Sequence, residues 1–296
     1  MNISVVIPVY KNTEELVKNL KHNLPFLKET EVIVVNDFPD VSIQKDLVDF
    51  PQIILIENKM NLGFAGAVNT GVAEATHPYV MLLNSDVRLR DSSYVKSISH
   101  FKEDSSLFAV SFAQIEKDGN IVGRNTLFWN RGFLSHAAVP ATSSGTTGWA
   151  EGGSCMIDKN KFEILHGFDT LYAPFYWEDV DLSYRAWKSR FRVYFDHTIK
   201  VEHHHESTIS KYFDKQRVTA TAYRNQFLFI WKNINDFSLL ISHLLLSPVQ
   251  CIRLALHGDF GMMRGHLAAI RLLSSALRHR HSYPITDSTV LSLFYE

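Results

Sequence analysis

Three acidic residues lie within four positions in the stretch Trp177-Glu178-Asp179-Val180-Asp181. Like charges at this spacing raise at least one carboxyl pKa unless a cation or a helix N-terminus compensates for them. The neighbouring aromatic residues would desolvate such a carboxylate and suit it to act as a general base near neutral pH. On a helix, Glu178 and Asp181 would share one face and Asp179 would project elsewhere. Acidic capping of a helix start is the alternative, and it explains one or two of the acids more readily than all three.

A second candidate for chemistry is Asp86, at the end of the tripeptide Asn84-Ser85-Asp86, which follows the apolar residues 79–83. A carboxylate on a loop directly after a buried strand suits a hard divalent cation, because such a cation takes oxygen ligands and bridges phosphates. An Asx turn is the alternative. For a lone Asp the Asx turn is the favoured interpretation.

Three glycines lie within residues 61–71, NLGFAGAVNTG, between a predicted strand and a predicted helix. Backbone amides at such a helix N-terminus can approach a phosphate. The spacing matches neither a Rossmann fingerprint, which would follow the first strand, nor a P-loop, since no Gly-Lys-Ser/Thr follows. Taken alone, this stretch is only weak evidence for phosphate binding.

Three consecutive histidines, from His203 to His205, follow another predicted strand. In an extended segment His203 and His205 would lie on one side and His204 on the other. Histidine clusters can bind metals or phosphates. Zinc sites usually draw on separated ligand pairs, so a structural zinc is not expected. We expect one functional histidine here and leave the roles of His204 and His205 open.

Alternating strands and helices must position these residues. Short runs rich in β-branched residues predict buried strands at residues 3–9, 31–35, 53–57 and 79–83. Helical spacing of apolar residues predicts helices at residues 13–27, 43–50 and 66–75, and Thr13 could cap the first. The alternation implies right-handed crossovers and a mostly parallel sheet covered on both faces, which is an α/β fold. Ligands bind beyond the carboxyl ends of such strands, where three consecutive strands end in polar residues that include Asp37 and Asp86.

The pattern weakens between residues 108 and 149, where we expect scattered short strands. A Ser/Thr/Gly loop at residues 142–148 could be a mobile flap or a disordered tip. Further elements are predicted as a strand at 152–158, a helical turn at 159–165, a helix at 180–188 and a strand at 192–195. From residue 214 to residue 280 the chain is predicted to be helical, without a repeat period.

Composition narrows the possible partners and compartments. The 296 residues are 46% hydrophobic and carry a formal net charge of -1, so no global field points to nucleic acid. Two cysteines, Cys155 and Cys251, cannot build a disulfide framework and fit a reducing compartment. The first residues lack the basic region and cleavage site of a signal peptide, so we expect a cytoplasmic protein. The longest apolar stretch, residues 237–246, is predicted to end before Pro248 and to be too short to cross a bilayer.

Together these motifs resemble the family 2 glycosyltransferases, which adopt the GT-A fold, and within them the rhamnosyltransferase-like branch. The resemblance covers roughly the first three quarters of the chain. In chain order the motifs are IPVYKN at 7–12, VVND at 34–37, NLGFAGAVNTG at 61–71, NSDV at 84–87, GGSCMI at 152–157, GFD at 167–169, WEDVDLSYR at 177–185, VEH at 201–203 and YRN at 223–225.

The resemblance implies a Rossmann-like GT-A domain over residues 1–228, with a mostly parallel sheet between helices, and a helical C-terminal extension over residues 229–296. It also implies an inverting transferase that uses a pyrimidine nucleotide diphosphate donor, either dTDP-rhamnose or a UDP-hexose. The acceptor would be a hydroxyl of a growing glycan or a lipid-linked glycan, in cell-surface polysaccharide synthesis.

The resemblance further implies roles for individual residues. Asp179 would take the acceptor proton, and Glu178 would orient the acceptor or the sugar. Asp86 and His203 would hold Mg²⁺ or Mn²⁺ on the diphosphate, while Asp37 would read the pyrimidine base. The other residues expected at the donor site are Pro8, Tyr10, Asn61, Gly63, Asn69, Asn84 and Ser85. Asp181 is expected to be structural or capping.

The chain departs from the family pattern at two places. Asn84 replaces the first acid of the D-x-D motif, which leaves one metal carboxylate. Phe38-Pro39 stands where many members have Gly-Ser, next to the position that would contact the base.

The C-terminal tail carries apolar residues at helical spacing and arginines near its end. Such a tail could rest on the inner face of a membrane that presents a lipid-linked acceptor, pack on the catalytic domain, or form a homodimer. Two other function classes stay open. A sugar nucleotidyltransferase should carry a Gly-rich loop with Arg and Lys at residues 10–13, where this chain reads YKNT. A non-catalytic protein that binds nucleotide sugars or glycans would not need both Asp86 and Asp179.

Overall fold

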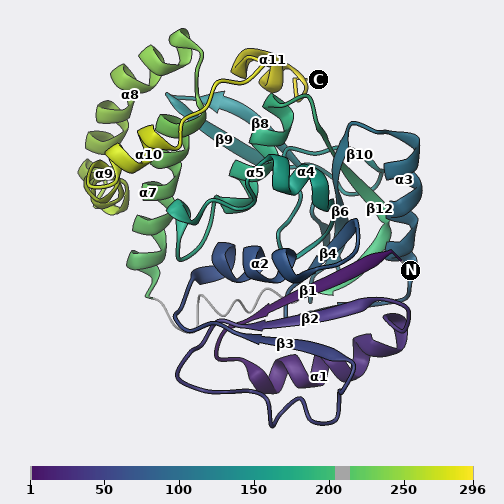
Figure 1. The fold of residues 1–296 in the computed structure, drawn as a ribbon. Coiled ribbons are helices and arrows are strands. Elements are labelled where there is room, and N and C mark those ends of the chain that lie inside the picture. Colours follow the sequence, from purple (N-terminus) through teal and green to yellow (C-terminus); the bar gives the residue numbers. More distant parts are fainter. Residues whose placement is uncertain (1, 204–213, 296) are drawn as a thin grey trace.

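The computed structural model describes residues 2–203 and 214–295. Its centre is a ten-stranded mixed sheet in the order β10-β12-β6-β11-β4-β1-β2-β3, with β5 paired to β12 and β7 paired to β6 (Figure 1). Helices cover both faces of the sheet, which confirms the predicted α/β class. The strands are β1 (Ile3–Val9), β2 (Glu31–Asn36), β3 (Ile53–Glu57), β4 (Tyr79–Leu83), β5 (Val87–Leu89), β6 (Leu107–Ile115), β7 (Ile121–Val122), β10 (Gly145–Thr146), β11 (Ser154–Asp158) and β12 (Arg192–His203).

The first four strands form the parallel half of the sheet, with β1 between β2 and β4. Successive side chains of a strand point to opposite faces, so Val5 and Val6 belong to different hydrophobic clusters. The cluster of Val6 includes Val68 of helix α2 (Gly63–Glu74). The cluster of Val5 includes Leu16 of helix α1 (Thr13–Asn23). The apolar run of the central strand β1 is therefore buried on both faces, as is typical of parallel sheets, whereas the edge strand β3 is partly exposed.

The second half of the sheet is mixed. Strand β11 runs antiparallel to both β4 and β6, and β12 runs parallel to β6. Outside this sheet, β8 (Asn125–Asn130) and β9 (Phe133–Ala138) pair with each other. The Ser/Thr/Gly loop contains β10, which pairs with β12, so this loop extends the edge of the sheet.

The helices after β5 complete the fold, and those of the tail pack beside the hairpin β8–β9 (Figure 1). They are α3 (Ser97–Glu103), α4 (Lys159–Ile164), α5 (Glu178–Lys188), α7 (Lys215–Asn233), α8 (Phe237–Leu256), α9 (Gly261–Ile270), α10 (Leu273–Arg278) and α11 (Asp287–Ser292), with short 3₁₀ helices at Leu24–Phe26, Ser93–Lys96 and Thr170–Tyr172. The expected boundary at residue 228 falls inside α7. Farther along the same helix, Lys232 Nζ lies 2.8 Å from Asp181 Oδ1.

Two predicted helices differ in the structure. Residues 43–50 form consecutive turns instead of a helix, because the amides of Asp46 and Phe50 bond to carbonyls three residues earlier. Their apolar residues Ile43, Leu47 and Phe50 are nonetheless buried, which explains the helical spacing. Helix α1 begins at Thr13, so Thr13 is not its cap, and it ends at Asn23 where Pro25 interrupts regular bonding.

Helix α8 corrects the expectation that the apolar stretch ends before Pro248. The helix continues through that proline to Leu256. Proline has no N–H, so the carbonyl of Leu244, four residues earlier, loses its helical hydrogen-bond donor. Both residues lie on the exposed side of the helix, where water can bond to that carbonyl. Among residues 2–203 and 214–295, α8 alone is long and apolar enough to cross a membrane, and little of it is buried.

Candidate functional site

A pocket of about 420 Å³ lies beyond the carboxyl ends of the parallel strands, between the starts of α2 and α5. Eleven of the twelve residues predicted for the site line it, from segments far apart in the chain. These residues are Pro8, Tyr10, Asp37, Asn61, Gly63, Asn84, Ser85, Asp86, Glu178, Asp179 and His203. The fold thus brings the predicted donor, metal and base residues to one cavity.

Asp37 is buried at the end of β2 and shapes one end of the pocket. Its Oδ1 accepts hydrogen bonds from Asn58 Nδ2 and from the amide of Leu62, both at 2.9 Å. Burial raises its pKa, and these hydrogen bonds oppose the rise. A carboxylate has up to four acceptor positions, so this anchoring leaves capacity for a ligand.

The neighbouring wall is the start of α2, where Gly63 adopts a φ of +71°. Its amide donates to Asn61 Oδ1 at 2.9 Å, which closes a turn over the pocket. A Cβ at this position would lie 3.3 Å from the carbonyl oxygen of Pro174. Both the backbone conformation and this close approach favour glycine.

Asn69 is the predicted site residue that does not line the pocket. It lies two turns into α2, and both ends of its amide bond to the backbone of Phe168: Nδ2 donates to the carbonyl at 2.8 Å, and Oδ1 accepts from the amide at 2.9 Å. The expectation that Asn69 lines the donor site is therefore corrected. It fastens α2 to the chain near the GFD motif.

The loop after β4 carries the candidate metal ligand. Asn19 of α1 donates to the carbonyl of Ser85 at 2.8 Å and so holds the loop from the opposite side. Asp86 Oδ1 lies 3.4 Å from Nε2 of His203, the last described residue of β12. His204 and His205 lie outside the described residues.

Gln114 of β6 orients the imidazole of His203. Its Nε2 donates to Ser154 Oγ at 2.9 Å, so Oε1 is the acceptor that faces His203 Nδ1, also at 2.9 Å. In the neutral form of the ring, a hydrogen bond of this kind places the proton on Nδ1 and the lone pair on Nε2, toward Asp86. Sequence reasoning did not identify Gln114, which also lines the pocket.

The other end of the pocket is built by the turn into α5, where Tyr176 and Trp177 have φ values of +68° and +79°. Two consecutive non-glycine residues in this region are strained and need support. Asn225 of α7 supplies it, because its Nδ2 donates to the carbonyls of Phe175 and Tyr176, both at 2.9 Å. The YRN motif therefore holds the turn that presents the acids.

The three acids of α5 do not face the directions that helical spacing predicted, which had placed Glu178 and Asp181 on one face. Glu178 and Asp179 both line the pocket, whereas Asp181 points into the protein. Asp181 bonds to Arg185 Nε at 2.7 Å and to Lys232 Nζ at 2.8 Å. Burial alone would raise the pKa of Asp181, but these two cations hold it well below its usual range. The prediction that Asp181 is structural agrees with these contacts.

Glu151 is a third carboxyl at this end of the pocket, beside Glu178 and Asp179, and sequence reasoning missed it. Its Oε1 accepts from Asn125 Nδ2 at 2.8 Å, and the amide of the next residue, Gly152, donates to Asp179 Oδ2 at 3.5 Å. A Cβ at Gly152 would lie 3.0 Å from the Phe64 ring and 3.6 Å from Asp179 Cβ, so glycine permits this close packing. An acid followed by two glycines before a buried strand was the available signal.

The three carboxyl groups perturb one another. Burial and the charge of Asp179 raise the pKa of Glu178 and that of Glu151 to about 8 each. Burial also raises the pKa of Asp179, but amides of Val180, at 2.8 Å, and Gly152 stabilise its anion. Backbone amides therefore favour the anion of Asp179, while both glutamic acids are mostly protonated at neutral pH.

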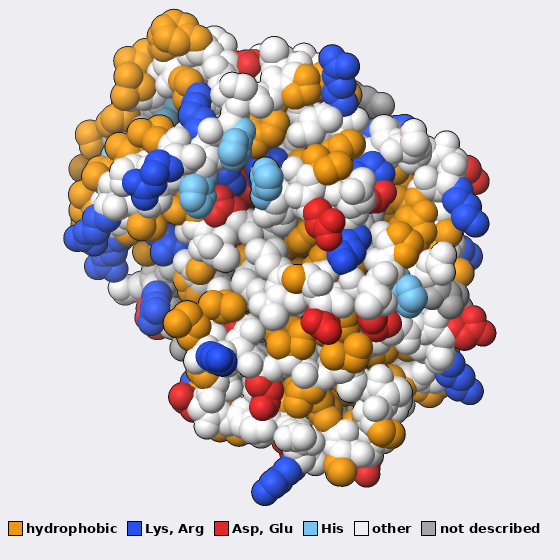
Figure 2. Space-filling model, in the orientation of Figure 1, with side chains coloured by type: hydrophobic (Ala, Val, Ile, Leu, Met, Phe, Trp, Pro, Cys, Tyr) orange, Lys and Arg blue, Asp and Glu red, His pale blue; other side chains and the backbone are white. Residues whose placement is uncertain are grey.

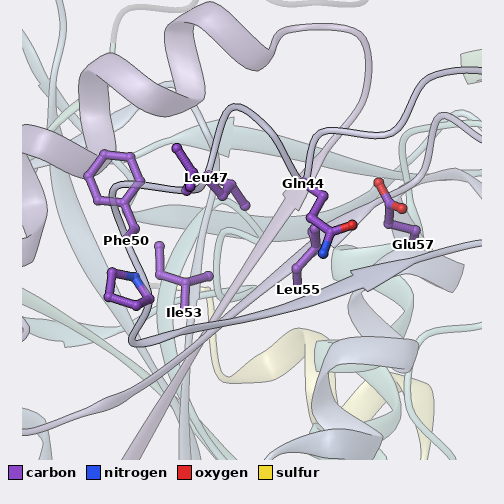
Figure 3. A pocket seen from close by; sticks show the side chains of 8 residues that line it. Gln44, Leu47, Phe50, Ile53, Leu55 and Glu57 are labelled. Atoms are coloured by element: carbon purple, nitrogen blue, oxygen red, sulfur yellow. The ribbon is translucent and has the colours of Figure 1, made fainter.

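A second hollow, of about 520 Å³, lies at the outer edge of the sheet along β3 (Figure 3). Its lining is largely apolar, with Phe50 at one end and Glu57 at the other. Glu57 Oε1 already accepts from the amide of Ile43 at 2.9 Å. This hollow lacks the converging acids of the first pocket, so we place the candidate site in the first.

Comparison with known proteins points to transferases. The sequence model described as "Glycosyl transferase family 2" matches residues 4–163. Over 214 residues the chain is 26% identical to a pre-mycofactocin glycosyltransferase of Mycobacterium tuberculosis, which covers 70% of this chain and 44% of that protein. Over 205 residues it is 24% identical to a poly-beta-1,6-N-acetyl-D-glucosamine synthase of Staphylococcus epidermidis, which covers 68% of this chain and 48% of that protein.

Among solved structures, the fold resembles that of GalNAc-T7 with UDP, GalNAc and Mn²⁺, at a TM-score of 0.62 and 14% identity, over 80% of this chain and 48% of that one. The chain spans less than half the length of the two curated relatives. The family match includes Asp37, Asp86 and Glu151 and ends before Asp179 and His203. The assignment of Asp179 and His203 to the site therefore depends on the geometry of the pocket.

Proposed function

Because this chain belongs to glycosyl transferase family 2, we propose that it transfers a sugar from a pyrimidine nucleotide diphosphate donor to a hydroxyl of a glycan or lipid-linked glycan, with inversion at the anomeric carbon. The candidate donors are dTDP-rhamnose and UDP-hexoses, and the proposed process is cell-surface polysaccharide synthesis. We place this activity in the cytoplasm, where thiols stay reduced, since Cys155 and Cys251 are both buried and free.

One observation carries the proposal. The Asp86–His203 pair and the carboxylate of Asp179 line a single pocket. An in-line displacement needs charge stabilisation at its leaving group and a base at its nucleophile. The pocket supplies residues suited to both tasks.

Asp179 is the proposed base. Backbone amides of Val180 and Gly152 stabilise its anion, and it takes the proton from the acceptor hydroxyl as that oxygen attacks the anomeric carbon. The bond between that carbon and the diphosphate oxygen breaks as the new glycosidic bond forms. Glu178 and Glu151, held mostly neutral, can donate hydrogen bonds to sugar hydroxyls without adding negative charge beside the base.

The donor set at the other end fits a divalent cation such as Mg²⁺ or Mn²⁺. Two ligands in adjacent positions of one octahedral ion lie roughly 3 Å apart, and Asp86 Oδ1 is 3.4 Å from His203 Nε2. A carboxylate oxygen and a neutral imidazole would hold the ion, which when bound neutralises the leaving diphosphate. No other acid of the predicted motif is present, because Asn84 occupies its first position.

Asp37 and the turn at Asn61 to Gly63 are proposed to bind the nucleotide. The carboxylate of Asp37 is anchored on Asn58 and Leu62, so it presents an acceptor in a fixed direction to a pyrimidine N–H. Tyr10 packs edge-to-face on Phe38, with ring centroids 5.5 Å apart. Phe38 follows Asp37 in the chain, and Phe38-Pro39 stands where many family members carry Gly-Ser.

The function is tested with the whole chain by a thermal-shift screen of dTDP-rhamnose, UDP-hexoses and GDP-sugars, each with Mn²⁺. A pyrimidine donor should stabilise the protein, and turnover of that donor should release the nucleoside diphosphate. NMR of an isolated product should show the inverted anomer. If no nucleotide sugar stabilises the chain, the transferase proposal is wrong.

A further inference from the structure

Exposed large apolar side chains are concentrated on the C-terminal helices. Of 23 such residues in the described parts of the chain, 14 lie between Phe237 and Leu277. Figure 2 shows hydrophobic side chains gathered along the edge of the molecule formed by α8, on the side away from β3. Monomeric soluble proteins rarely expose an apolar patch of this extent without a partner.

On α8 all of the exposed large apolar residues except Leu246 form one stripe. Its members recur at helical spacing along the whole helix: Phe237, Ile241, Leu244, Leu245, Val249, Ile252 and Leu256. The opposite side of α8 is fixed to the domain. There the buried His243 bonds through Nδ1 to the carbonyl of Gly132 at 2.7 Å and through Nε2 to Trp231 Nε1 at 3.1 Å.

Helix α9 extends the same surface with Phe260, Met263, Leu267 and Ile270. It lies close against α7, because Gly265 brings the backbones together: a Cβ there would stand 2.8 Å from the carbonyl oxygen of Ala220. We call the exposed apolar residues of α8 and α9 the docking face.

The charge around the docking face is positive. Residues 237–286 contain five arginines and one acid, Asp259. Four of the arginines, Arg253, Arg264, Arg271 and Arg278, are exposed. Figure 2 shows basic side chains along the margin of the apolar surface. An apolar face bordered by arginines is complementary to an anionic lipid surface, which would attract the guanidinium groups and accept the apolar side chains.

We propose that the docking face binds the surface of an anionic lipid bilayer, with α8 lying in the plane of the interface. A transmembrane arrangement of α8 does not fit its contacts. Residues 242 and 243, in the first half of the helix, bond to Trp129, Trp231 and Gly132 of the domain, and α9 returns directly to α7.

This orientation relates the bilayer to the pocket. The turn at Phe175 and Tyr176 lines the acceptor end of the pocket, and Asn225 of α7 holds it. Gly265 of α9 packs against Tyr223 on the same stretch of α7. One helix thus separates the docking face from that end of the pocket, a position suited to a lipid-linked acceptor. The membrane proposal itself does not depend on the transferase activity.

Co-sedimentation of the full chain tests the proposal, with vesicles of phosphatidylcholine alone and of phosphatidylcholine mixed with phosphatidylglycerol. We expect binding to the mixed vesicles that weakens at high salt. Leu245→Glu combined with Leu256→Glu, at side chains 64% and 81% exposed, should reduce binding at least tenfold. Val48→Glu, at a side chain 75% exposed beside β3, is the matched control and should not change it.

Charge is tested separately. Arg253→Gln and Arg271→Gln should each weaken binding to the mixed vesicles by roughly fivefold. Circular dichroism checks that every variant folds, and light scattering reports the oligomeric state. Absence of vesicle binding at low salt would overturn the proposal, and so would an equal loss in Val48→Glu. A dimer that Leu245→Glu disrupts, without vesicle binding, would assign the face to a second copy instead. Donor turnover, measured without vesicles, should be unchanged in these variants.

Discussion

Asp86 Oδ1 and His203 Nε2 lie 3.4 Å apart, although one follows β4 and the other ends β12. If this pair holds the cation, Asp86→Asn and His203→Gln should each raise the Mn²⁺ concentration needed for half-maximal donor turnover at least tenfold. Gln114→Met removes the hydrogen-bond acceptor of His203 Nδ1 and should raise the same Mn²⁺ concentration roughly 10-fold. Electron paramagnetic resonance of Mn²⁺ measures the binding directly. The exposed Asp40→Asn is the control, and unaltered Mn²⁺ binding in Asp86→Asn would contradict the assignment.

Asp179→Asn should lower kcat by about 10²- to 10⁴-fold, the usual contribution of a general base. Donor binding should be nearly unchanged, because the substitution keeps the side-chain shape and the metal ligands lie elsewhere in the pocket. Rates under donor saturation and donor Kd from calorimetry separate the two effects. Asp49→Asn, on the exposed segment before β3, is the control. Transfer at the wild-type rate in Asp179→Asn would reject the base assignment but not the transferase.

Glu151 should make the protein less stable as pH rises. Its pKa is about 8 in the folded state and near its ordinary value when unfolded, so the folded state binds the extra proton between about pH 4.5 and pH 8. Stability therefore falls over that interval. Glu151→Gln, which resembles the protonated form, should be more stable than the wild type at pH 8 by about 4 kcal/mol and equal to it near pH 4. Urea unfolding at several pH values measures this, and a pH-independent difference would be inconsistent with the raised pKa.

Asp181→Asn should destabilise the protein by about 3–5 kcal/mol, because it leaves the buried cations Arg185 and Lys232 without that carboxylate. The depressed pKa of Asp181 means that its contribution is present above the unfolded pKa near 3.8 and is lost as pH falls below it. Arg192→Gln removes an exposed ion pair with Asp104 and should cost less than about 1 kcal/mol. Chemical denaturation compares the two variants. Similar losses of unfolding free energy in both variants would mean that the buried ion pairs stabilise the protein no more than the exposed pair does.

Much of the fold could be predicted because strand burial leaves a strong local pattern. The runs that became β1 to β4 are apolar on both faces, and this pattern together with the intervening helices predicts a parallel sheet. Ligands bind beyond the carboxyl ends of such strands, and this rule identified Asp37 and Asp86 as candidate site residues. Helical spacing failed at residues 43–50, since burial of Ile43, Leu47 and Phe50 is equally possible in successive turns.

Only part of the candidate site could be predicted from the sequence. Asn69 and Asn61 belong to one motif, yet only Asn61 lines the pocket, because the amide of Asn69 is bonded to the backbone of Phe168. Glu178 and Asp181 were expected on one face, but Lys232 from α7 and Arg185 draw Asp181 inward. The partners that decide these orientations come from other segments of the chain.

The sequence by itself determined the four parallel strands, the order of the motifs and the chemical types of the site residues, because those properties depend on local patterning. Only the tertiary structure decided that Glu151 adjoins Asp179, that Gln114 orients His203, and that α8 runs through Pro248 with one side exposed. Each of these depends on distant segments packing together, and the pKa values and exposed surfaces that matter for function arise from that packing.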